Sequence, residues 1–226
     1  MTSVNPSTAQ VFEPAATDAV TAGDFVALAR ARLRPEAPDA AALASSPGGD
    51  HALDGLLPTN AAAPKAAAVL VPIVLRQEPM LLFTQRSATL REHSGQIAFP
   101  GGRVDPTDAS VLDAACREAE EEIGLARSHI DPIGYLDPYL SGTNYLVMPV
   151  VAGVSPDYIL TINPHEVADT FEVPVRFLMN PGHHQLHSKE WQGRIRHYYA
   201  MPYMSRYIWG LTAGIVRNLY ERLYTP

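Results

Sequence analysis

A glutamate-rich segment directly behind a pair of glycines limits what this chain can fold into more than any other part of its sequence. The segment, residues 99–125, reads FPGGRVDPTDASVLDAACREAEEEIGL. On a helix, residues three and four positions apart are neighbours, so Glu118 would face both Glu121 and Glu122. Like charges at this spacing repel by about 0.2–0.5 kcal/mol per pair. A solvated acidic helix face is one explanation; a divalent cation, which prefers carboxylate oxygens and shares its shell with substrate phosphates, is the other.

The second half of this segment matches a known pattern. Residues 117–125 (REAEEEIGL) resemble the Nudix box at every fixed position, with Ala119 at the aliphatic position. The first half departs from the box. Asp108 stands where the box has Glu, and eight residues rather than seven separate it from Arg117. The same one-residue insertion occurs in the coenzyme A pyrophosphatase branch of the Nudix family, which this chain resembles.

Three further stretches are similar to the signature of that branch. They are residues 81–87 (LLFTQRS), 90–102 (LREHSGQIAFPGG) and 207–214 (YIWGLTAG). The resemblance covers roughly residues 66 to 220. It implies an α+β fold, namely a Nudix-type α/β/α sandwich with a mixed sheet, and it implies that two copies pair as a homodimer by analogy with other members.

Composition and charge narrow the class of protein. The chain has 226 residues, 46% of them hydrophobic, and a formal net charge of −7 without a basic tract. This disfavours nucleic-acid binding, which depends on Lys and Arg neutralising phosphates. Cys116 is the only cysteine, so no intrachain disulfide is expected, and its apolar helix position favours a core role. No membrane-length apolar run or secretory signal is visible, and a cytoplasmic enzyme is therefore expected.

The chain divides into two regions by composition. Residues 1–64, rich in Ala and Pro, read as an N-terminal extension, and residues 65–226 as the Nudix domain. A helix is predicted at Asp24–Leu33, stopped by Pro35, and a linker at Pro38–Pro64. The extension is either poorly ordered, the reading favoured for residues 1–20, or a dimerisation arm or cover over the active site.

Apolar patterns and turn residues predict the elements of the domain. Pro72 suggests that the first strand lies at an edge or carries a bulge. In the central helix, Asp108 is the candidate N-cap and Gly124 the C-terminal glycine. A terminal helix is predicted at Trp209–Leu223. The predicted strands are 66–75, 80–86, 95–99, 133–136, 146–151, 158–162 and a hairpin pair at 183–191 and 195–201, while 172–179 is strand or helix.

The glutamates of the central helix are the candidate ligands for Mg²⁺ or Mn²⁺. Glu122 and Glu118 are assigned first and Glu121 next, and the resemblance implies that the Gly102 carbonyl adds a ligand. Arg117 is expected to hold a carboxylate through two hydrogen bonds and so to fix the orientation of a glutamate.

The general base stays open between two kinds of carboxylate. A helix glutamate, Glu118 or Glu121, could serve. Glu166, in the sequence NPHEV, is the candidate from a distant loop, and its alternative reading is a glutamate at the start of a helix.

Three basic residues upstream of the glycine turn are candidates for contacting substrate phosphates. They are Arg86, Arg91 and His93, and the alternative is that they form scaffold salt bridges. A zinc site is disfavoured because the histidine spacing matches no standard pattern. One tyrosine stacking on adenine is conceivable, but sequence cannot place it. The histidines considered for zinc are His183, His184, His187 and His197. The tyrosines considered for stacking are Tyr139, Tyr145, Tyr198, Tyr199 and Tyr203.

These residues together predict a divalent-metal-dependent pyrophosphohydrolase. The resemblance implies a small-molecule substrate, coenzyme A or an acyl-coenzyme A, cleaved to 3′-phospho-AMP and (acyl) 4′-phosphopantetheine. The first alternative is the same chemistry on another nucleoside diphosphate derivative, such as a sugar nucleotide, ADP-ribose or a dinucleoside polyphosphate. The others are a non-catalytic binding module, which would usually lack the metal-binding glutamates, and an RNA-processing enzyme, which the acidic charge disfavours.

Overall fold

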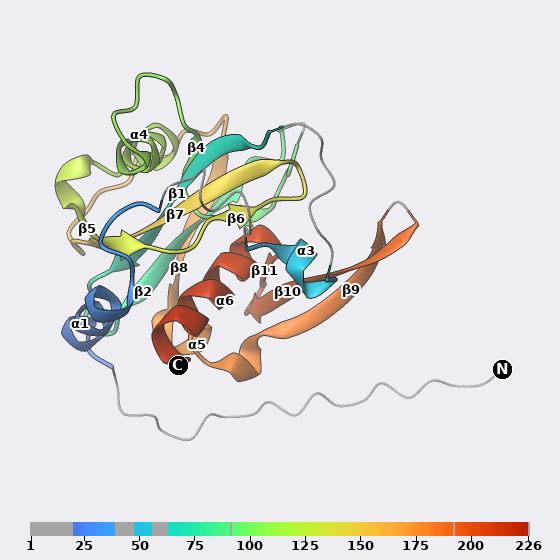
Figure 1. Cartoon of the computed structure of the whole chain (residues 1–226). Coiled ribbons are helices and arrows are strands. Elements are labelled where there is room, and N and C mark those ends of the chain that lie inside the picture. Colours follow the sequence, from blue (N-terminus) through green and yellow to red (C-terminus); the bar gives the residue numbers. More distant parts are fainter. Residues whose placement is uncertain (1–19, 39–47, 56–62, 91, 192, 226) are drawn as a thin grey trace.

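The fold is built around a large mixed sheet that is covered on both faces (Figure 1). The structure is a computed structural model, and it describes residues 20–38, 48–55, 63–90, 92–191 and 193–225. Within these ranges the sheet has eight strands, with the path β3-β2-β1-β7-β5; β4 pairs with β1, β6 with β7 and β8 with β2. The strands are β1 (Lys65–Val74), β2 (Met80–Arg86), β3 (Ile97–Ala98), β4 (Gly101–Arg103), β5 (Ile130–Tyr135), β6 (Tyr139–Leu140), β7 (Tyr145–Val154) and β8 (Val167–Pro174).

Strand β1 lies in the middle of the sheet and separates two cores. It pairs in parallel with β7 over its whole length, and its last eight residues are buried. Because side chains alternate along a strand, Val69 and Val71 pack on one face while Ala68 and Leu70 pack on the other. The near-continuous apolar sequence is what a strand covered on both faces requires.

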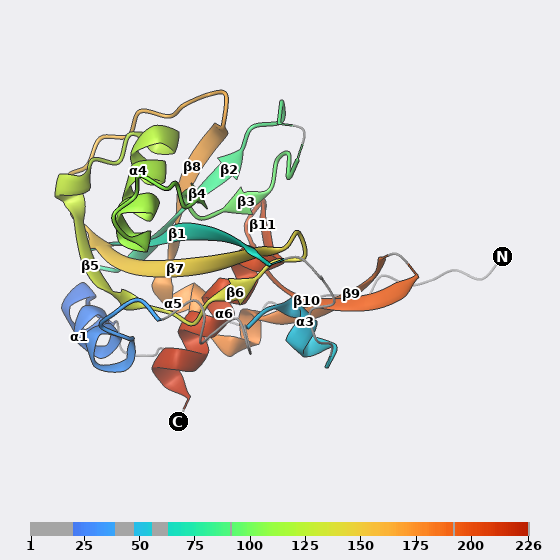
Figure 2. The ribbon, with the colours of Figure 1, turned by 45° about the horizontal axis from the view of Figure 1, so that its top comes forward.

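One face of the sheet is covered by α4 (Val111–Ile123), and the other by α1 (Ala22–Arg32) and α6 (Leu211–Tyr224), as both views show (Figures 1 and 2). Phe25 and Ala29 of α1 are fully buried in the same core as Leu219 of α6. A second sheet extends away beside α6. Its strands are β9 (Gln185–Trp191), β10 (Arg194–Tyr203) and β11 (Arg206–Trp209), and the short helices are α3 (Asp50–Leu53), α5 (Val175–Leu178), η1 (Arg127–His129) and η2 (Pro181–His183).

The bounds of most predicted elements are confirmed to within four residues, and the predicted α+β sandwich is the observed fold. The hairpin turn between β1 and β2 and the hairpin of β9 and β10 form as predicted. Gly124 ends α4 in the left-handed conformation, at φ 68°. The linker predicted at 38–64 lies largely outside the described residues, and its described part contains α3. Two further predictions fall outside the described ranges. They are the phosphate contact of Arg91 and the poor order of residues 1–20, of which only Val20 is described.

Three predictions about these elements are wrong: the strand at 158–162, the cap of α4 and the edge position suggested by Pro72. Residues 158–162 are irregular rather than a strand, although Leu160 and Ile162 pack against the core beneath α4. Ser110, not Asp108, caps α4, because its side chain accepts a hydrogen bond from the backbone N–H of Asp113. The terminal helix is confirmed, but it begins at Leu211, two residues later than predicted, because Trp209 belongs to β11.

Pro72 does not mark an edge strand, since β1 has partners on both sides. On one side β4 pairs with residues 67–69 and β2 with residues 73 and 74. The Leu70 N–H points to that side, where it donates to the Pro100 carbonyl, and Pro72 has the same orientation by alternation. The missing N–H of Pro72 therefore falls at the gap between two partner strands, where no ladder bond is lost.

Every helix in the described part of the chain is too short or too polar to cross a membrane.

Candidate active site

The glycine turn brings the backbone of β4 against α4. Gly101 has φ +155°, and a Cβ there would lie 2.4 Å from the Ala68 carbonyl oxygen. A Cβ on Gly102 would lie 2.5 Å from the Glu118 carboxyl carbon. Any larger residue at either position would displace β1 or the Glu118 carboxylate. The glycines therefore set the distance between the turn and the glutamates.

Glu122 is a carboxyl group held out of water with little to neutralise it. It is 3% exposed, and its partners are the Gly101 N–H, which donates to Oε2 at 3.3 Å, and the Arg86 guanidinium, 3.9 Å from Oε1. Burial raises the pKa of Glu122 to about 8, against the lowering effects of Gly101 and Arg86. The charges of Glu118 and Glu166 raise it further. A cation placed here would supply the positive charge that the residues around Glu122 provide only in small part.

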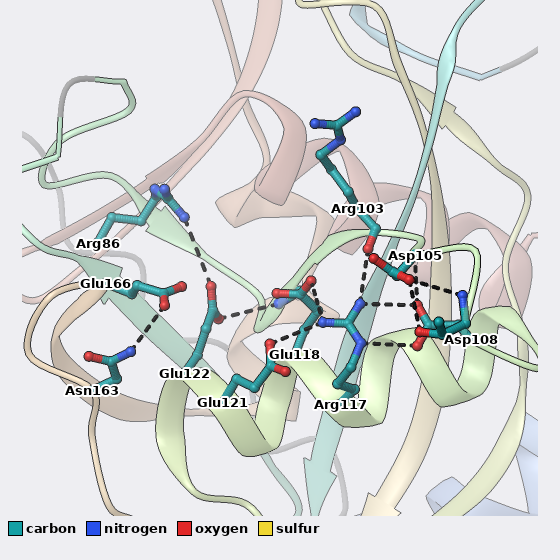
Figure 3. A network of polar contacts seen from close by, with 12 residues as sticks. Arg86, Arg103, Asp105, Asp108, Arg117, Glu118, Glu121, Glu122, Asn163 and Glu166 are labelled. Carbon is teal, nitrogen blue, oxygen red and sulfur yellow. Dashed lines mark hydrogen bonds and ion pairs between the residues drawn. The ribbon is translucent and has the colours of Figure 1, made fainter.

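Arg117 organises the other side of the cluster (Figure 3). Its Nε and Nη2 donate to the two oxygens of Asp108, both at 3.0 Å, and its Nη1 donates to Glu118 and Glu121, also at 3.0 Å. Nη2 also donates to the Arg103 carbonyl at 3.1 Å. The expected two-bond contact therefore forms with Asp108, and the glutamates receive one bond each.

Glu118 and Glu121 differ in their surroundings. The Glu118 carboxylate is half-buried, and burial raises its pKa despite the Arg117 hydrogen bond. The Glu121 side chain is 56% exposed and turned toward Arg117. As the side chains stand, no three His, Cys, Asp or Glu residues among those described form a ready-made metal cage. A shared cation would require Glu118 or Glu121 to turn from Arg117.

The loop before β8 carries Glu166 to this cluster. Two backbone hydrogen bonds fasten the loop to the end of α4: Thr161 N–H donates to the Ile123 carbonyl at 2.8 Å, and Asn163 N–H to the Glu122 carbonyl at 2.9 Å. The Asn163 side chain then donates to Glu166 Oε1 at 3.0 Å. Glu166 precedes a strand, so its alternative reading as a helix-start residue is wrong. Sequence reasoning missed Asn163, although its place three residues before Glu166 was a usable signal.

The residues predicted to contact phosphates are not shown gathered at the carboxylate cluster. Arg86 points at Glu122, as Figure 3 shows. His93 lies on the exposed loop after β2 with φ +57°, and its ring bonds the Gln96 side chain at 2.9 Å. Arg91 lies outside the described residues. Of the two that the structure describes, Arg86 lies beside the carboxylates and His93 bonds Gln96 instead.

The four histidines considered for zinc have separate partners. His183 and His184 bond the backbone carbonyls of Phe177 and Leu178, and His197 bonds Asp54. His187 bonds Gln185. These contacts account for them as parts of the scaffold.

Sequence comparisons agree with this geometry. The NUDIX domain model matches residues 64–192, more than half of the chain. This chain belongs to the Nudix hydrolase family. A relative from Cronobacter sakazakii, named uncharacterized Nudix hydrolase NudL, is 45% identical over 163 residues, covering 69% of this chain and 81% of that protein. Proteins of the same name from Escherichia coli strains are 45% identical over 155 residues with the same coverage.

Solved structures give weaker matches. DR0079 from Deinococcus radiodurans has a TM-score of 0.47 at 16% identity, covering 75% of this chain and 90% of that one. A binary complex of Ap4A hydrolase from Caenorhabditis elegans has a TM-score of 0.43 at 20% identity, covering 49% and 80%.

For this Nudix hydrolase, the departure from the box has a structural meaning. Asp108 has a side chain one carbon shorter than Glu and is separated from Arg117 by one extra residue. It nevertheless holds both the Nε and the Nη2 of Arg117. The two-bond contact expected of Arg117 is therefore present despite the altered spacing.

Proposed function

We propose that this Nudix hydrolase is a divalent-metal-dependent pyrophosphohydrolase that cleaves coenzyme A or acyl-coenzyme A. Water would attack one phosphorus of the diphosphate, and the bridging P–O bond would break. The products would be 3′-phospho-AMP and (acyl) 4′-phosphopantetheine. The choice of substrate is supported by the upstream signature and the one-residue insertion; the named relatives are uncharacterized and leave the substrate open.

The observation that carries the hydrolytic proposal is the state of Glu122. Its carboxyl group is buried, has one backbone donor at 3.3 Å and lies beside two further carboxylates. Burying an acid in this way destabilises its charged form, and such a group is usually kept for a ligand or for chemistry. A hard divalent cation matches the oxygen donors available there.

Glu118, Glu121 and Glu122, with the Gly102 carbonyl, are the proposed holders of Mg²⁺ or Mn²⁺. A bound cation of this kind neutralises phosphate charge and favours ionisation of water. Glu118 and Glu121 would give up their hydrogen bonds from Arg117 and bind the cation instead. Asp108 would keep the guanidinium in place through its two hydrogen bonds. The Asp108–Arg117 pair then acts as a fixed support beside the exchanging glutamates.

Glu166 is the proposed general base, with Glu118 or Glu121 as the alternatives. It lies on a loop bound to α4, and one of its carboxylate oxygens, Oε1, is oriented by Asn163. A base held in this way can accept a proton from the attacking water. Arg86, Arg91 and His93 are proposed to contact the phosphates; Arg86, beside Glu122, has the best support.

The test is product analysis of the purified protein with Mg²⁺ or Mn²⁺. Coenzyme A, acetyl-coenzyme A, ADP-ribose and UDP-glucose are compared in parallel. The proposal predicts 3′-phospho-AMP from the first two, at least about tenfold faster in kcat/KM than any product from the others. Faster cleavage of ADP-ribose or UDP-glucose would reject the coenzyme A assignment while keeping the pyrophosphohydrolase.

A further inference from the structure

A pocket lies on the face of the sheet opposite the carboxylates. Its volume is about 430 Å³, within the range of small-molecule sites. Along β2, consecutive side chains point to opposite faces. Arg86 contacts Glu122 on α4, whereas Gln85 contacts Arg206 on β11 and lines the pocket. We name this the β3–β11 pocket; its principal lining residues are Gln85, Gln96, Arg206, Tyr207 and Trp209.

Two segments far apart in the sequence meet in this pocket. Residues 94–97 and 207–209 belong to the stretches 90–102 and 207–214 named above, and the proposed hydrolytic chemistry gives no role to residues 94–97 or 207–209 themselves. Thr212 joins the two regions by donating to the Ile97 carbonyl at 3.0 Å. The fold thus builds one wall of the pocket from each segment.

The aromatic wall has aromatic neighbours on the same face of the second sheet. Tyr207 and Trp209 are two residues apart on β11, so their rings lie on the same face. Trp209 packs edge-on against Tyr198 at 5.5 Å between ring centroids, and Tyr207 against His187 at 6.4 Å. Tyr207 is nevertheless 43% exposed. An accessible aromatic surface with fixed neighbours is suited to stacking on a planar ring.

The charge of the pocket disfavours a phosphate as its main occupant. Arg206 donates to Asp169 and to Gln85, and its guanidinium lies over the Phe171 ring at 4.5 Å. Its charge is therefore already paired. The polar groups left at the wall are amide, hydroxyl and backbone groups, which suit the edge of a neutral heteroaromatic ring.

We propose that the β3–β11 pocket binds the adenine ring of a nucleotide. The ring would stack on Tyr207 and Trp209 and present its edge to the Gln96 side. The proposal rests on the proposed function in one respect, since a coenzyme A substrate would itself carry an adenine. The ring can come from that substrate or from a free adenine nucleotide, and the experiment separates the two sources.

The direct test is tryptophan fluorescence. The chain has two tryptophans, so Trp191→Phe leaves Trp209 as the reporter. AMP added to the metal-free Trp191→Phe protein should change this fluorescence saturably, whereas ribose 5-phosphate, which lacks the base, should not. No saturable change with AMP, or an equal change with both, would overturn the proposal. Because AMP binding needs no turnover, the result does not depend on whether coenzyme A is hydrolysed.

The second test uses two tyrosines that are equally exposed. Tyr207 and Tyr224 are both 43% exposed, but Tyr224 lies at the end of α6 away from the pocket. Tyr207→Ala in the Trp191→Phe background should weaken AMP binding about tenfold, the usual loss when a stacking partner is removed, and Tyr224→Ala should not. Equal affinities in the two variants would reject the role of Tyr207.

Kinetics then identify the source of the ring. A raised KM for coenzyme A with unchanged kcat in Tyr207→Ala, but not in Tyr224→Ala, indicates that the pocket receives the adenine of the substrate. Unchanged KM together with weakened AMP binding indicates a separate nucleotide site. Both results support adenine binding in the pocket.

Discussion

Glu122 is buried and Glu172 is partly buried, with 18% of its side chain exposed, and their environments are opposite. Glu172, on β8, receives two hydrogen bonds from Arg76 at 2.8 and 2.7 Å and one from the Tyr158 hydroxyl at 2.6 Å. Glu122, on α4, receives one backbone bond at 3.3 Å and has Arg86 at 3.9 Å. Arg76 holds the pKa of Glu172 below its ordinary value, whereas burial raises the pKa of Glu122 to about 8.

The contrast separates a structural carboxylate from one kept for a ligand. At Glu172 the hydrogen bonds to the charged form offset the cost of removing it from water. At Glu122 no comparable set of hydrogen bonds offsets this cost, and the charges of Glu118 and Glu166 further destabilise its charged form. Burial alone does not therefore identify a functional acid. Burial of a carboxyl group that lacks hydrogen bonds to its charged form is the better indicator. Substitutions of these two glutamates, and of Glu166 and Asp108 in the cluster around Glu122, test this distinction.

The largest effect is expected from Glu122→Gln. The shape of the side chain is kept and its ligand charge is lost, so turnover should fall by at least about a thousandfold. Initial rates with saturating Mg²⁺ measure this, and far-UV circular dichroism checks the fold. Glu172→Gln is the matched control and should keep activity within about threefold. Near-parental activity of Glu122→Gln would remove that residue from the mechanism.

Glu166→Gln should have the second largest effect. If Glu166 accepts the proton from water, kcat should fall about 10²- to 10⁴-fold. Affinity for Mg²⁺, read from the metal dependence of the rate, should stay nearly constant because the three helix glutamates remain. Loss of metal affinity with kcat intact would make Glu166 a ligand and leave Glu118 or Glu121 as the base.

Asp108→Asn tests the support behind the helix glutamates. The change weakens both bonds to the Arg117 guanidinium, which then no longer has a fixed position beside Glu118 and Glu121. We expect a loss of about 10- to 100-fold in metal affinity or kcat, as for other groups that orient ligands. Asp113→Asn serves as the control because Asp113, also near α4's start, bonds Ser110 instead. Equal effects of the two changes would argue against a specific support.

Glu172→Gln should have the smallest effect on activity and a clear one on stability. Losing the charged partner of Arg76 should cost about 1–2 kcal/mol of unfolding free energy at pH 7, since the pair is partly exposed. The folded pKa of Glu172 is lowered, so this stabilisation is complete above the ordinary value of 4.5 and is lost as pH falls through the folded pKa.

Urea unfolding of the parent and Glu172→Gln at pH 7 and at pH values below 4.5 would measure this trend. The difference between the two proteins should shrink with falling pH. A difference that is independent of pH would mean that packing, not the charged pair, stabilises the parent.

Local patterns predicted much of this molecule. The glycine pair, the glutamate spacing and Gly124 define α4 and its neighbours because each of these signals acts within a few residues. Asp108 and Ser110 are both good caps, but the Asp108 carboxylate is used elsewhere, since it accepts from Arg117 across the turn and from the backbone N–H of Asp105. Residues 158–162 (YILTI) have the apolar and β-branched composition of a strand, but Tyr158, Leu160 and Ile162 pack on the core beneath α4 without joining a ladder.

The features that sequence missed depend on distant parts of the chain. Asn163 acquires its role because its loop is bonded to the end of α4. The β3–β11 pocket combines residues 85 and 94–97 with residues 205–209, and no local pattern records that contact. The pairing that keeps Glu172 charged likewise joins residues 76, 158 and 172.

The most direct test of the metal assignment is the thermal shift of the substrate-free protein on adding Mn²⁺ or Mg²⁺. A ligand that binds the folded state raises its stability in proportion to the logarithm of ligand concentration above Kd. The parent and Glu172→Gln should both be stabilised with the same concentration dependence, and Glu122→Gln should require at least about tenfold more metal for the same shift. An identical metal response in Glu122→Gln and the parent would contradict the claim that Glu122 is buried for a cation.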